Sequence, residues 1–166
     1  DVWDAMIEQG KHAWLLWTAT RPGVFPDAAL RKLACRFIRE TPLPDGRKVW
    51  DLLTDERSRK AVEVAELYAN GNATGGELQA AHAAAGDAAY AVYTTACAAG
   101  DAACAVYAAA AAYAACAVYA AAAAYAACAA ADAGRVAARD AADVAKAAQV
   151  QMIVEMGNPF GKGKGK

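Results

Sequence analysis

The sequence predicts an all-α protein in three parts: a small N-terminal helical head over residues 1–72, a very long alanine-rich helix over residues 74–156, and a flexible Gly/Lys tail over residues 157–166. Apolar residues recur at helical spacing in the first part of the chain. Alanine, the strongest helix former, then dominates residues 78–131, where Asp87 and Asp101 are the only charged side chains. Glycine and proline gather at a few points, which predicts where helices end.

The head is expected to contain three helices. The first ends at a turn over residues 20–23, and the second begins at Pro26 and Asp27. The apolar residues of the first helix recur at helical spacing and are Trp3, Met6, Ile7, Trp14 and Trp17. The second helix is expected to bury the stripe formed by Leu30, Leu33, Ala34 and Phe37.

A loop and a short apolar turn at residues 49–53 are expected to lead into the third helix. The loop, TPLPDG at residues 41–46, has the prolines and the Asp-Gly pair that are typical of turns. Thr54 or Asp55 can cap the third helix, which ends at ANGNATGG, residues 69–76. Its buried face is expected to contain Ala61, Val64, Ala65 and Tyr68.

Thr74 and Glu77 form a T-x-x-E capping box, which predicts that a new helix begins there. The next strong stop is the Gly-Asn-Pro sequence at residues 157–159. Between these points glycines are isolated, and the polar loops that usually join helices are missing. We therefore expect one long helix, with a helical hairpin folded at Gly100 or Gly134 as the alternative.

Residues 104–131 contain a twelve-residue unit written twice, with a third begun. On an α-helix this period rotates the pattern by about 120° per unit, so the tyrosines do not form a single apolar face. The tract nevertheless exposes more apolar surface than a monomer normally does. This favours self-association, or packing against another helical protein, over a solitary spacer helix. The contact area is expected to come from Tyr93, Tyr107, Tyr113, Tyr119 and Tyr125.

Charge and hydropathy argue against two kinds of partner. The 17 basic and 18 acidic residues nearly cancel, so nucleic acid is not an expected partner. Residues 102–131 are long enough to cross a bilayer, but they lack the Leu, Ile and Phe that favour insertion, so a membrane-inserting helix is the weaker interpretation. The odd cysteine count, without a signal peptide before the head, predicts reduced thiols in a cytoplasmic protein.

No catalytic, cofactor-binding or metal-binding residues are expected. Ser58 is the only serine and lies in a charged helical run, and His12 and His82 have no companions at metal-ligand spacing. Cys35 is expected to be a buried structural thiol on the second helix. The other cysteines point to different sides of the alanine-rich helix: Cys97, Cys104, Cys116 and Cys128.

Three segments resemble an uncharacterised family of bacterial and phage hypothetical proteins. They are LRKLACRFIRE (residues 30–40), VWDLLTDERSRKAVEVAELYANG (residues 49–71) and GNPF (residues 157–160). The LLTDERSR run is the most specific part, and the alanine-rich middle matches only in composition. The resemblance implies a helical head with an alanine-rich helix, and it brings no known activity or catalytic residues.

The sequence therefore favours a non-enzymatic structural or interaction protein. In this hypothesis the head docks a partner, and the alanine-rich helix acts as a spacer or a self-association element. Ice binding is the alternative, because some antifreeze proteins are long alanine-rich helices. Those helices carry threonine at an eleven-residue spacing, whereas Thr94 and Thr95 are adjacent and unrepeated here. An enzyme is the third possibility, with no constellation of residues to support it.

Overall fold

The computed structural model describes residues 2–19, 21, 23–43, 46–98 and 139–161. Within these ranges the chain forms one short 3-10 helix, η1 (Val49–Leu52), and six α-helices: α1 (Val2–Glu8), α2 (His12–Ala19), α3 (Asp27–Glu40), α4 (Glu56–Ala69), α5 (Gly75–Ala98) and α8 (Arg139–Glu155). Extended pairing in these ranges is limited to isolated bridge residues, among them the pair Pro42 and Lys48. The expected all-α class is confirmed.

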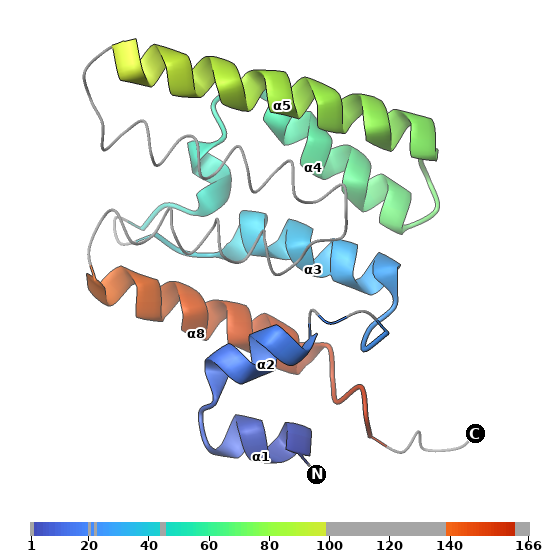
Figure 1. The fold of residues 1–166 in the computed structure, drawn as a ribbon, viewed down its shortest axis with the longest axis vertical. Coiled ribbons are helices and arrows are strands. Elements are labelled where there is room, and N and C mark those ends of the chain that lie inside the picture. The colour runs from blue at the N-terminus through green and yellow to red at the C-terminus, as the bar shows by residue number, and fades with distance from the viewer. Residues whose placement is uncertain (1, 20, 22, 44–45, 99–138, 162–166) are drawn as a thin grey trace.

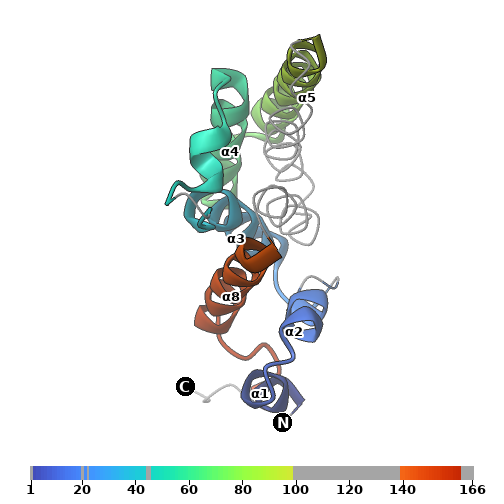
Figure 2. The ribbon, with the colours of Figure 1, turned by 90° about the vertical axis from the view of Figure 1, so that its left-hand side faces the viewer.

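The helices lie across the long axis of the molecule, one above another (Figure 1). Contacts between neighbouring helices give the order α1, α2, α8, α3, α4, α5, with η1 against α3. Figure 2 shows the same stack from the side, with α8 between α2 and α3. α8, the last of the described helices, thus separates two helices that follow each other in the chain. Among the described helices, none is both long enough and apolar enough to cross a membrane.

The single helix expected over residues 74–156 is not what the described residues show. α5 contacts α4 at one end of the stack, whereas α8 contacts α2 and α3 nearer the other end. They are two helices in different layers, because each packs its apolar residues against a different part of the head. Residues 99–138, which include both expected hairpin positions, lie outside the described residues, so the hairpin stays a prediction.

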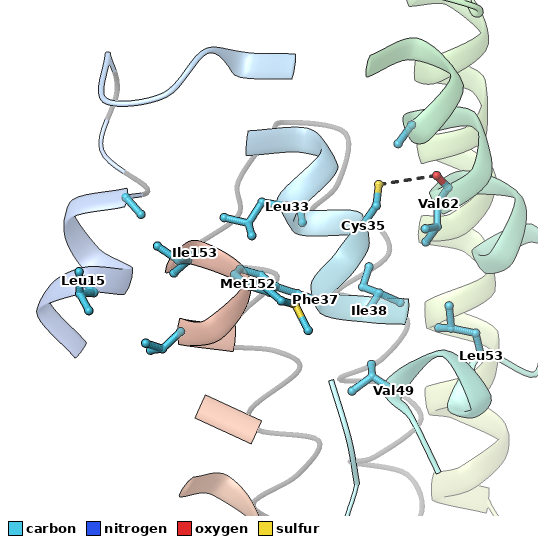
Figure 3. Close-up of a cluster of buried hydrophobic side chains, with 14 of the residues drawn as sticks. Leu15, Leu33, Cys35, Phe37, Ile38, Val49, Leu53, Val62, Met152 and Ile153 are labelled. Atoms are coloured by element: carbon cyan, nitrogen blue, oxygen red, sulfur yellow. Dashed lines mark hydrogen bonds between the residues drawn. The ribbon is translucent and has the colours of Figure 1, made fainter. Parts of the chain in front are cut away.

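One hydrophobic core runs through the stack, and residues on both sides of the expected boundary at residue 72 contribute to it. Figure 3 shows Met152 and Ile153 of α8 between Leu15 of α2 and Phe37 of α3. Farther along α3, the core continues to Val49 of η1, to Leu53 directly after η1 and to Val62 of α4. α8 is therefore part of the same packed unit as the head.

The first predicted helix is two helices in the structure. Gly10 adopts a left-handed conformation, with φ of 62°, between α1 and α2. The backbone N–H of Lys11 donates to the carbonyl of Met6 at 2.8 Å, and that of Gly10 donates to the carbonyl of Ile7 at 3.1 Å. This pair of bonds is a Schellman motif, which ends a helix and turns the chain. The apolar spacing alone gave no sign of the break.

Most other helix ends agree with the sequence. Asp55 is the N-cap of α4, and its carboxylate accepts from the backbone N–H of Arg57 at 2.9 Å. The capping box is also confirmed, because Glu77 accepts from the backbone of Thr74 at 2.7 Å and donates its own N–H to the Thr74 hydroxyl at 3.2 Å. Gly157, with φ of 86°, follows the end of α8 as the sequence predicted.

Replacing Ile153 by alanine tests whether α8 belongs to the core. Ile153 is fully buried, so the substitution removes packed methyl groups and leaves a cavity, which is expected to lower the free energy of unfolding by about 2–5 kcal/mol. Val144→Ala is the matched control, because Val144 lies on the same helix but is 58% exposed, and its effect is expected within about 0.5 kcal/mol. Urea titration of both variants measures the difference. Equal stabilities would contradict the packing of α8 between α2 and α3.

Candidate functional site

The TDERSR segment, residues 54–59, builds the corner between η1 and α4. Asp55 caps the helix and also accepts from the Arg57 guanidinium at 2.8 Å. The hydrogen bonds from Arg57, first from its side chain and then from its backbone, hold the pKa of Asp55 below its ordinary value. Arg59 donates from Nε to the carbonyl of Leu53 at 2.6 Å. Each of these contacts orients the backbone, so a structural role accounts for the most specific sequence motif.

Trp50 lies at the same corner, and two guanidinium groups lie over its ring. The guanidinium carbon of Arg39 is 4.0 Å from the Trp50 ring centroid, and that of Arg59 is 5.6 Å away. Arg39 also forms a two-point ion pair with Glu66, with the second N–O distance at 2.9 Å. Of the basic residues of α3, Arg31 is buried, and Arg39 is engaged in these contacts.

A cleft of about 600 Å³ opens beside this corner, between α4 and α5. Its lining residues are mostly charged and are Trp50, Glu56, Arg57, Arg59, Lys60, Glu63, Ala81 and Ala84. Arg57 and Arg59 are held by the contacts just described, and Lys60 lies 3.7 Å from Glu63. Two cations of the lining, Arg57 and Lys60, are therefore in ion pairs, and the lining contains no serine, threonine, cysteine or histidine.

Two side chains that could act as nucleophiles, Cys35 and Ser58, are buried. Cys35 is buried as expected, and its thiol donates weakly to the carbonyl of Val62 at 3.8 Å. Burial first, and the charge of Glu66 second, raise the pKa of Cys35 to about 12, so the thiol is protonated at neutral pH. Ser58 is also buried on α4. In the described part of the chain, no group of three or more His, Cys, Asp or Glu side chains could hold a metal ion.

The GNPF segment, residues 157–160, attaches the end of the described chain to α1. The Asn158 side chain accepts from the backbone N–H of Phe160 at 2.8 Å and donates to the Asp4 carboxylate at 3.3 Å. The Phe160 ring packs edge-on against Trp3, with ring centroids 6.2 Å apart, and Phe25 packs against the same ring at 6.0 Å. This motif also has a structural role.

Two large side chains that the packing of the core leaves exposed lie on α2. Trp14 and Trp17, two of the apolar residues that recur at helical spacing, are 64% and 56% exposed. They are three positions apart, so they lie one turn apart on the outer side of the helix, whereas Leu15 and Ala19 point into the core. Arg21 follows, with its guanidinium carbon 4.6 Å from the Trp17 ring centroid. We call Trp14, Trp17 and Arg21 the α2 tryptophan surface.

The residues predicted for self-association are placed only in part. Tyr93 lies on α5, and Tyr107, Tyr113, Tyr119 and Tyr125 lie outside the described residues. Sequence reasoning did not single out Trp14 and Trp17 as a surface. A usable signal was the run of four apolar residues, Trp14 to Trp17, because a helix with one buried stripe cannot bury all four.

The Asp55 cap predicts a pH-dependent contribution to stability. Asp55→Ala removes the cap acceptor and is expected to cost about 0.5–2 kcal/mol at neutral pH. Because the folded pKa of Asp55 is lowered, its contribution is complete above the unfolded pKa, about 3.9. This contribution to stability is lost as the pH falls through the pKa that Asp55 has in the folded protein. Denaturant titrations should therefore show a wild-type advantage that is constant down to about pH 5 and shrinks below about pH 4.

Asp27→Ala is the control for this measurement. Asp27 is in the first turn of α3, whose N-cap makes no side-chain hydrogen bond, so its replacement is expected to change stability by less than about 0.5 kcal/mol. An Asp55→Ala difference that grows on acidification would contradict the assignment of the cap.

Comparison with known proteins adds no relative from which a role could be transferred. No family model, no curated protein and no solved structure matches the chain. The family resemblance of the LLTDERSR and GNPF segments thus stays a prediction. Among the residues that the structure describes, the α2 tryptophan surface is the best-defined candidate site.

Proposed function

We propose that this chain is a non-enzymatic structural or interaction protein whose head docks a partner protein through the α2 tryptophan surface. The observation that carries the proposal is the exposure of Trp14 and Trp17 on a helix whose opposite side is buried. Two large exposed aromatic side chains on one helix face are unusual for an isolated surface and are typical of binding sites. Tryptophan and arginine also dominate the residues that contribute most to binding at protein interfaces.

The rest of the head supports this role by holding α2 in place. Leu15 and Ala19 anchor α2 in the core, and α2 packs against α8 on one side and α1 on the other. A surface on a fixed helix loses little conformational entropy when it binds, because its backbone is already ordered. The two tryptophans are therefore presented in a nearly prearranged geometry.

Selection from a displayed random peptide library tests the proposed docking surface. The full-length protein is the target, and the Trp14→Ser/Trp17→Ser double variant is used for counter-selection. Peptides that bind the surface should bind the wild type at least about 30-fold more tightly than the double variant, because buried tryptophan anchors contribute about 2 kcal/mol or more.

The control variant removes apolar side chains that are also exposed but lie elsewhere. Leu67→Ser/Val144→Ser changes α4 and α8, where these residues are 42% and 58% exposed, and should leave peptide binding unchanged. A library in which no peptide distinguishes the tryptophan variant from the wild type would overturn the proposal.

The second part of the proposed role belongs to the alanine-rich tract, which we propose acts as a spacer or self-association element. The support is the composition of residues 102–131, where tyrosine is the only side chain large enough to give substantial contact area.

Replacing Tyr107, Tyr113, Tyr119 and Tyr125 together by alanine separates these two roles. Helicity should stay level or rise, because alanine has the higher helix propensity. If the tyrosines hold an interface, association should weaken by a few kcal/mol, at roughly 25 cal/mol per Å² of apolar surface no longer buried. Solution mass over a dilution series, with circular dichroism, measures both. An unchanged mass distribution at every concentration would mean that the tyrosines do not hold an interface, and that the tract acts as a spacer.

A further inference from the structure

We infer that the partner bound at the α2 tryptophan surface is an acidic protein segment with apolar anchor residues. The inference rests on the proposed function and specifies the chemistry of its partner. It comes from the placement of a cation beyond each end of the pair of exposed tryptophans: Lys11 before Trp14 and Arg21 after Trp17. Between Glu8 and Asp27 the sequence contains no carboxylate.

Backbone contacts fix where the two cations lie. The carbonyl of Lys11 accepts from the N–H groups of Trp14 and Leu15, both at 3.0 Å, so Lys11 directly precedes the first turn of α2. The N–H of Arg21 donates to the carbonyl of Thr18 at 3.0 Å, so Arg21 directly follows the last turn. Both residues are exposed. Lys11 and Arg21 therefore lie at the two ends of α2, on either side of the two exposed tryptophans in the chain.

Contacts with Trp17 orient the Arg21 side chain. Its Nε donates to the Trp17 carbonyl at 3.3 Å, while its guanidinium lies over the ring. A guanidinium has five N–H donors, so these contacts leave donors that a carboxylate can accept from. Apolar anchors of the partner would pack on Trp14 and Trp17, and its carboxylates would pair with Lys11 and Arg21.

The surroundings of α2 favour a narrow acidic segment over a broad anionic surface. α1 contacts α2 and carries Asp4 and Glu8, both exposed, so the two helices together are close to neutral. A bilayer responds to charge averaged over a wide area, within about a Debye length of 8 Å, and would meet these carboxylates as well. A peptide segment that contacts α2 alone would not meet the carboxylates of α1.

Single-stranded nucleic acid is disfavoured by the same geometry. Arg21 covers one face of the Trp17 ring, which leaves fewer ring faces on which bases can stack. Binding along the phosphate backbone needs several cations, whereas the row offers Lys11 and Arg21.

The test uses the full-length protein and the tryptophan-dependent peptides selected from the random display library. These peptides are expected to be enriched in Asp and Glu relative to the unselected library. One of them, synthesised with a fluorescent label, should bind about 3- to 30-fold more weakly when its acidic residues are replaced by glutamine. Its binding should also weaken as sodium chloride is raised, which tests the charge contribution without altering the protein.

Variants of the protein test the two cations directly. Lys11→Gln/Arg21→Gln should weaken binding of the acidic peptide about 3- to 30-fold and leave binding of the glutamine-substituted peptide unchanged. Lys32→Gln/Lys60→Gln is the matched control: it removes the same total charge from exposed positions on α3 and α4 and should leave both unchanged. Circular dichroism of each variant checks that the head remains folded.

The outcomes separate this inference from the proposed function. Tryptophan-dependent peptides that are neutral or basic would overturn the acidic partner and leave the docking surface standing. A library without tryptophan-dependent peptides would overturn both. Tryptophan-dependent binding to vesicles of phosphatidylserine in phosphatidylcholine, or to single-stranded oligothymidine, that is tighter than binding to the selected peptide would also overturn the acidic protein segment.

Discussion

The structure depends on the burial of one face of α8 between α2 and α3. Ile153 and Met152 lie among side chains from both helices, and without them the apolar side of α2 would have no partner in that layer. The ion pair between Arg36 of α3 and Glu155 of α8, at 2.7 Å, closes the outer edge of the same contact. Because α2 is held this way, its buried and exposed sides are fixed, and the position of Trp14 and Trp17 follows from the packing of α8.

Local signals predicted much of the head. The boundaries of α3, the Asp55 cap and the Thr74–Glu77 capping box were all visible, because each depends on residues within one or two turns. The division of the first helix was missed, because a Schellman turn at Gly10 leaves the apolar spacing of its neighbours intact. The place of α8 was missed for a different reason: its partners are more than a hundred positions away in the chain, and no local pattern records them.

The candidate site was harder to predict than the fold. The most specific motif residues, Asp55, Arg57 and Arg59, proved to orient the backbone at a helix corner. The tryptophans of α2 were recognised only as apolar residues at helical spacing, because periodicity identifies apolar positions and cannot say which of two apolar faces finds a partner. Only the packing of Leu15 and Ala19 decides that the opposite side of α2 faces outward. A functional surface of this kind becomes visible when tertiary contacts are known.

The position of α8 also has a consequence for how the protein acquires its structure. α3, α4 and α5 are contiguous in the sequence and pack in sequence order, so they can associate once Ala98 has emerged from the ribosome. The layer formed by α2 cannot close until α8 follows, and contacts over such a separation are slow to form. For that interval the ribosome-bound chain carries Leu15 and Phe37 without the side chains that cover them. Chaperones that recognise exposed apolar segments would therefore meet this protein at α2 and α3, before its last helix is complete.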